Sequence, residues 1–275
     1  MKSSENKRIE NLYFVHILPF DRQTIKSTLK HEKELNRVDD IISILFELWE
    51  MTLSAFREVS TLVMMDSIEA IFASRILLIH GYYAQANILL RASLESWVAG
   101  LFYDDHPVEW ERISEELVEE KVPSFTKEIL PYFFKFPAFR ELKKHDPKVQ
   151  ERISAYYKDL STYIHALGIK KTNIKNLKRL KSDIYTKFSK KDLEQFIKNL
   201  SILKDFLILF TFLRYYSDFR LYRRKTPELI LNLDERYVES LLKVDQEEEL
   251  FTQKTRTRII EMLDKKKSMD GERVG

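Results

Sequence analysis

Glycine is too scarce in this chain for a fold built from β-strands and tight turns. The 275-residue sequence contains five glycines, and two of them lie in the last five residues. Three glycines remain for the whole folded body, whereas β-hairpin turns depend heavily on glycine. Leu, Ile, Lys and Glu are abundant and Val and Thr are few, which favours helix. We therefore predict an all-α fold, an up-and-down helical bundle with additional N- and C-terminal helices.

Apolar residues spaced three and four apart mark the individual helices. The predicted helices cover residues 22 to 51 with a break near 51–54, 66 or 67 to 80, 82 to 103, 147 to 167, and 190 to about 224. Asp21 is a candidate N-cap, Gly81 a candidate C-cap or close helix contact, and Ser189 with Asp192 a candidate capping box. Three prolines between residues 122 and 137 predict short, irregular helices there.

One domain accounts for almost the whole chain. A protein of this length buries roughly 70–75% of the surface that its unfolded chain exposes, which is enough for a sizeable core. No stretch is long and polar enough to separate two domains. We expect an N-terminal arm over residues 1–20, a single helical domain over 21–263, and a disordered tail over 264–275.

Composition and motifs exclude several classes of protein. Without cysteine the chain has no disulfide, no thiolate nucleophile and no Cys-based zinc or iron–sulfur site. It contains no GxGxxG, Walker-type or HExxH motif and no Glu-x-x-His pair, so we expect no cofactor and no metal. Signal-peptide and membrane-span patterns are also missing, so we expect a cytoplasmic protein without a membrane partner.

The most apolar stretch, residues 76–103, carries two charges in its middle. Arg91 and Glu95 are four residues apart, so a helix places both on one face. The first interpretation is a local ion pair that fixes the register of the helix, since a buried pair must overcome its desolvation. The second is a binding site in which Arg91 holds an anion beside Glu95.

A second constellation shares one face of the helix predicted after residue 147. Lys158, Ser161 and His165 fall in line over roughly 10 Å of that helix. A basic group, a hydroxyl and an imidazole together could bind a phosphate and move a proton, which makes them candidate catalytic residues. Alternatively, Ser161 and His165 hydrogen-bond to a neighbouring helix, for instance to Arg91 or Glu95.

These two segments carry a resemblance to a known family. The succession GYYAQANILLRASLES, then YYKDLSTYIHALG, resembles the HEPN-type helical proteins of bacteria and archaea over about residues 65 to 220. It is most similar to their uncharacterised relatives with an R-x-x-x-E helix and a later Y-x-x-L-S-x-x-x-H helix. The resemblance implies a helical bundle, often a homodimer, of the kind tied to antiviral defence or toxin–antitoxin systems.

Active members of that family cut RNA without a metal, using an Arg and a later His that are separated by four to six residues. The three corresponding positions before His165 are Leu160, Asp159 and Lys158, so this chain lacks the arginine. Lysine has no planar fork with which to grip a phosphate at two points. The departure argues against a metal-independent endoribonuclease.

The segment after His165 is strongly basic. Residues 169 to 191 contain nine Lys or Arg residues and one acid, and their first lysines are candidate RNA-binding residues: Lys170, Lys171 and Lys175. Such a stretch can contact a phosphate backbone in a non-specific, salt-sensitive way. It can equally be a solvated loop attracted to the acidic segment 104–120 of the same or a second subunit.

Two functional hypotheses follow. The first is a HEPN-like protein of a defence or toxin–antitoxin system that binds RNA or a nucleotide-like anion, with His165 as acid–base and Lys158 and Arg91 holding phosphate if it is catalytic. The second is a non-catalytic helical module for protein interaction or dimerisation. They differ in whether Arg91, Lys158 and His165 converge on an open cleft.

Overall fold

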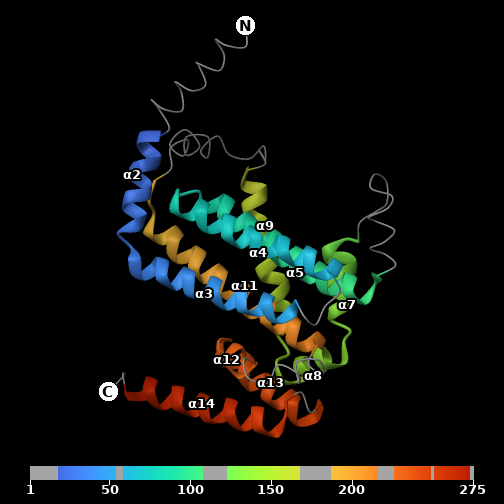
Figure 1. The fold of residues 1–275 in the computed structure, drawn as a ribbon. Coiled ribbons are helices and arrows are strands. Elements are labelled where there is room, and N and C mark those ends of the chain that lie inside the picture. The colour runs from blue at the N-terminus through green and yellow to red at the C-terminus, as the bar shows by residue number, and fades with distance from the viewer. Residues whose placement is uncertain are drawn as a thin grey trace.

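The protein is an all-α helical bundle. A computed structural model of the chain describes residues 18–53, 58–107, 123–167, 187–215, 226–248 and 251–272. Every regular element in these ranges is a helix, which confirms the predicted fold class (Figure 1). Figure 1 shows α12, α13 and α14 gathered at one end of the bundle, with α14 outermost.

The helices follow one another in this order: α2 (Leu18–Leu29), α3 (Glu32–Thr52), α4 (Glu58–Ile79), α5 (Tyr83–Asp105), the π-helical turn η2 (Phe125–Ile129), α7 (Leu130–Phe133), α8 (Pro137–His145), α9 (Val149–Leu167), α11 (Lys190–Tyr215), α12 (Thr226–Leu231), α13 (Glu235–Glu248) and α14 (Gln253–Glu272).

Helices α4 and α5 form a hairpin with the most extensive helix–helix contact of the described residues. Gly81 ends α4 with a φ of 79°, a conformation that glycine adopts without a steric penalty. The Tyr82 N–H donates to the Leu77 carbonyl (2.9 Å) and the Gly81 N–H to the Leu78 carbonyl (3.0 Å). These are the two bonds of a Schellman motif, so the C-cap interpretation of Gly81 is confirmed.

Helix α5 is the central element, because α4, α9, α11 and η2 all pack on it. Its Trp97 is fully buried and donates its indole N–H to the Thr211 hydroxyl of α11 at 2.9 Å. The Asn199 amide of α11 donates to the Asn87 side-chain oxygen of α5 at 2.7 Å. The Tyr156 hydroxyl of α9 donates to the Asn199 carbonyl at 2.8 Å. Buried polar groups therefore join α5, α9 and α11 in one register.

Several local predictions are confirmed. Helix α3 ends at Thr52, close to the predicted break, and short helices begin at Phe125 as the prolines indicated. The Asp192 N–H donates to the Ser189 hydroxyl at 3.3 Å, which caps the start of α11. The Ser189 N–H donates to the Tyr83 hydroxyl (3.1 Å) instead of to Asp192, so of the predicted capping box only this cap is formed. The predicted end of α11 near residue 224 and most of the acidic segment 104–120 lie outside the described residues.

Three boundaries differ from the prediction. Helix α4 begins at Glu58 rather than near residue 66, because Ser67 bonds to the Ser93 hydroxyl of α5 (2.7 Å) instead of capping a helix. Helix α2 begins at Leu18, so Asp21 lies within its first turn rather than at the predicted N-cap, and its carboxylate lies 2.8 Å from Nδ1 of His80. Helix α14 continues to Glu272, so residues 264 to 272 are helical where a disordered tail was predicted.

Candidate functional site

Arg91 and Glu95 meet Tyr157 of α9 in a three-membered cluster. Arg91 donates from Nε to Oε1 of Glu95 (2.9 Å) and from Nη2 to the Tyr157 hydroxyl (2.6 Å). The Tyr157 hydroxyl in turn donates to Oε1 of Glu95 at 2.6 Å. The Arg91 guanidinium also lies over the Tyr157 ring, with Cζ 4.7 Å from its centroid. The predicted ion pair of α5 is thus tied to a second helix.

The Tyr157 phenol acts as a neutral donor in this cluster. Burial and the neighbouring Glu95 carboxylate raise the pKa of Tyr157 to about 12, against a smaller opposing effect of Arg91. Phe125 of η2 stacks on the Tyr157 ring with centroids 4.9 Å apart, which excludes water from that side. Arg91 and Glu95 keep 21% and 34% of their side-chain surface exposed, so the cluster is partly accessible to solvent.

Tyr157 was not singled out as a functional residue from the sequence. It is the first residue of the Y-x-x-L-S-x-x-x-H pattern, and this was the available signal. Its partner Arg91 lies 66 positions away along the chain, so no local spacing rule connects them. The cluster engages two of the three donor nitrogens of Arg91 and favours the structural interpretation of the Arg91–Glu95 pair.

The candidate catalytic residues do not all join this cluster. Lys158 is exposed and makes no ion pair with any described side chain. The Ser161 hydroxyl donates to the Tyr157 carbonyl one turn back in its own helix, at 2.7 Å. His165 lies in α9, but its side chain is outside the described part of the molecule. Lys170, Lys171 and Lys175 are outside it as well, so their roles stay predictions.

A recess of about 490 Å³ adjoins the cluster at Tyr157. Its wall is formed by η2, α7 and α9, and it includes Phe134, Lys135, Gln150 and Ser154. Two aromatic rings, one cation and several polar groups around such a volume could receive a small organic anion. This recess therefore lies beside the predicted site, next to Tyr157.

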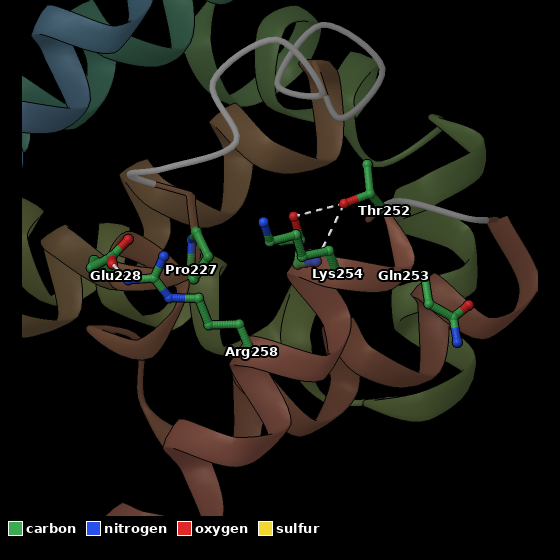
Figure 2. A pocket seen from close by; sticks show the side chains of 7 residues that line it. Pro227, Glu228, Thr252, Gln253, Lys254 and Arg258 are labelled. Atoms are coloured by element: carbon green, nitrogen blue, oxygen red, sulfur yellow. Dashed lines mark hydrogen bonds and ion pairs between the residues drawn. The ribbon is translucent and has the colours of Figure 1, made fainter.

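Figure 2 shows a larger recess of about 740 Å³ beside the N-terminus of α14. The Thr252 hydroxyl accepts the Thr255 N–H at 3.2 Å and so caps α14. Arg258 is paired with Glu228 of α12 (Figure 2). The cap and the ion pair stabilise the contact between α12 and α14, which is a structural role.

Helix α4 carries an unusual concentration of exposed apolar side chains. Seven large apolar residues are exposed in the described part of the chain, and four of them lie on α4: Leu62 (54%), Met65 (42%), Phe72 (43%) and Ile76 (58%). With Glu69 they are spaced three and four residues apart, so they share one face. Monomeric surfaces rarely gather apolar side chains in this way without a partner.

The described residues form neither a metal-binding cluster nor a membrane-spanning helix. They contain no group of three or more His, Asp or Glu side chains placed to hold a metal ion. None of their helices is both long and apolar enough to cross a bilayer. Comparison with known proteins found no matching family model, no matching curated protein and no matching solved structure.

Proposed function

We propose that the protein is a helical interaction module that forms a homodimer through the outer face of α4. The observation that supports this is the exposed apolar stripe formed by Leu62, Met65, Phe72 and Ile76. Spacing of three and four residues over two heptads is the pattern with which one helix packs along another. The stripe is about 21 Å long, since each residue of a helix rises 1.5 Å.

The inner side of α4 is already used within the bundle. Met64, Ile68, Ile71 and Leu78 are buried against the rest of the protein. Apolar residues on both sides of a helix are typical of a helix that is covered on both sides. A partner on the outer face would complete this burial. The ring contact between Phe72 and Phe46 of α3, with centroids 6.4 Å apart, extends the apolar surface beyond α4.

Charge complementarity favours a second copy of the chain as this partner. The described acidic side chains of α4 are Asp66 and Glu69, and its one cation is Arg75, nearer the other end. An antiparallel two-fold pairing centred on Phe72 therefore brings Glu69 of one copy beside Arg75 of the other. Arg75 donates from Nε and Nη2 to Asp39, which leaves Nη1 for such a contact.

Sedimentation equilibrium from about 1 to about 100 µM tests the dimer. We expect the wild type to dimerise and the double variant Leu62→Glu/Ile76→Glu to stay monomeric with its helical content intact, since both side chains are exposed in one copy. The matched control is Leu29→Glu/Ile260→Glu, which changes two exposed apolar residues outside α4 and should leave the dimer unchanged. A wild type that is monomeric throughout this range would refute the proposal.

Cysteine cross-linking tests the arrangement, because the chain has no cysteine of its own. A disulfide requires Cα atoms about 4.4–6.8 Å apart. Phe72→Cys lies at the proposed two-fold axis and should cross-link two copies, whereas Leu62→Cys should not, since its two copies would be about 30 Å apart. Equal cross-linking at both positions would instead indicate parallel helices.

A second candidate function is the binding of RNA or a nucleotide-like anion. It is favoured by Lys158, an exposed cation without a described ion pair, and by the recess beside Tyr157. Incubation with labelled RNA at low salt, with and without a chelator, tests binding and metal-independent cleavage together. Loss of cleavage in His165→Ala would support an acid–base role for His165. Absence of both binding and cleavage in the wild type would eliminate this candidate.

A further inference from the structure

A separate charged recess of about 430 Å³ lies where α3, α9, α11 and the start of α13 meet. Its wall contains four cationic side chains and three carboxylates: Arg37, Arg152, Lys198 and Arg236, with Glu194, Asp205 and Asp234. The volume is in the range of small-molecule sites, which is roughly 300–1,000 Å³. The recess is distinct from the Tyr157 cluster and from the α4 stripe.

The two aspartates that line the recess, Asp205 and Asp234, are paired within the fold. The Lys204 ammonium lies 3.2 Å from Oδ1 of Asp205, and the Asp234 N–H donates to the same oxygen at 3.3 Å. Arg236 holds the Asp234 carboxylate through Nε (3.1 Å) and Nη2 (3.0 Å). These pairs occupy Asp205 and Asp234, so neither carboxylate adds an uncompensated negative charge to the recess.

Two guanidinium groups hold Tyr237, an aromatic side chain of the recess, in place. Arg152 donates from Nε to the Tyr237 hydroxyl at 3.2 Å, and its Cζ lies 5.4 Å from the centre of the Tyr237 ring. Arg236 lies over the same ring at 5.3 Å. Tyr237 is itself buried. Contacts from α9 and α13 therefore fix the position of Tyr237 in the absence of a ligand.

Three other donors that line the recess, in contrast, have no partner among the described residues. Arg37 of α3 and Lys198 of α11 form no ion pair with any described residue. The half-buried Ser201 hydroxyl, one turn after Lys198, likewise has no hydrogen-bond partner among them. Glu194, the remaining carboxylate of the recess, lies 3.9 Å from Lys190. Within the described part of the chain, the unpaired donors of the recess are thus two cations and a hydroxyl from two different helices.

We propose that this recess binds a small molecule with an oxyanion group, a phosphate or a carboxylate, held by Arg37, Lys198 and Ser201. An oxyanion accepts hydrogen bonds from all three donors and also balances the charge of the two cations, which a neutral or cationic ligand does not do. The site needs neither a second copy of the chain nor the Tyr157 cluster. Its test is therefore independent of both proposed functions.

Isothermal titration with inorganic phosphate and with succinate, at constant ionic strength, tests this site. We expect saturable binding of one of the two anions at one site per chain, and the anion that binds identifies the oxyanion class. Arg37→Gln/Lys198→Gln should weaken binding by about tenfold or more, since two charge-assisted hydrogen bonds are lost. Ser201→Ala should weaken it by about twofold to tenfold.

The matched control removes two positive charges from the same helices outside the recess. Lys33→Gln/Lys191→Gln changes exposed lysines of α3 and α11 that do not line it, and it should leave the dissociation constant unchanged. An equal loss in the control pair would show general charge attraction and overturn the proposal. Failure of the wild type to saturate with either anion up to about 10 mM would overturn it too.

Discussion

Gly100 allows α5 to lie close to α4, and its replacement by alanine measures how tight this contact is. A methyl group at Gly100 would lie 2.8 Å from Cγ of Met64 and 3.0 Å from the carbonyl oxygen of Ser60. The Met64 side chain can rotate away, but the Ser60 carbonyl belongs to the α4 backbone and moves only with the helix. Relief of the second contact therefore requires a local displacement of α4.

Two opposing effects set the magnitude of the change. Alanine favours the helical state over glycine by about 1 kcal/mol. Overpacking in a well-packed core costs about 1–3 kcal/mol. We expect the contact to dominate, so that Gly100→Ala lowers the free energy of unfolding by about 1 kcal/mol. For a chain of this length that corresponds to a melting temperature lower by about 2 °C.

Urea unfolding followed by far-ultraviolet circular dichroism provides the measurement. Ala92→Gly, at a half-buried position of the same helix, estimates the propensity difference by itself and is the matched control. The cost of the close contact is then the change in the free energy of unfolding caused by Gly100→Ala, corrected for the difference in helix propensity between glycine and alanine. A Gly100→Ala variant more stable than the wild type by about 1 kcal/mol would mean that only propensity acts, and the close approach would be refuted.

Three further predictions concern buried or strained positions. Burial raises the pKa of Asp205 from 3.8 to about 6. The protonated carboxyl therefore contributes to the free energy of unfolding below pH 3.8, and this contribution is lost as pH rises through 6. The stability of Asp205→Asn relative to wild type should therefore increase by about 2 kcal/mol between pH 4 and pH 7, measured by urea unfolding at both values; no increase would contradict the raised pKa. Asn199→Leu leaves the Asn87 side-chain oxygen without its donor and should cost about 1–3 kcal/mol, and adding Asn87→Leu should recover part of this in a double-mutant cycle. Gly81→Ala forces a side chain into the left-handed region and should cost about 1–2 kcal/mol in thermal unfolding, and a neutral result would contradict the role of Gly81 in ending α4.

Helix ends were predictable where the signal is local. The glycine at residue 81 and the serine at residue 189 act on backbone groups within a few positions, so their effect can be recognised in the sequence. Ser67 misled the prediction because a serine can also bond across a helix interface, as it does to Ser93. Choosing between a cap and an interhelical bond requires knowing which helix lies opposite.

In the candidate site, too, only the contact within one helix could be predicted from the sequence. Spacing of four residues placed Arg91 and Glu95 together, and the structure confirms their contact. Their third member, Tyr157, comes from another helix, and its distance to Arg91 depends on how α5 and α9 pack. The recess with Arg37 and Lys198 was not predicted at all, since its wall comes from four helices distant in sequence.

The sequence alone determined that this protein is helical, because three glycines in the folded body cannot supply the turns of a β-fold and the residue usage favours helix. It also placed two charges in the middle of its most apolar stretch. Only the tertiary structure decided which apolar side chains stay exposed. Helix α4 is apolar on both sides, so its pattern does not reveal the inner face. Packing against α5 buries one face and leaves Leu62, Met65, Phe72 and Ile76 on the other.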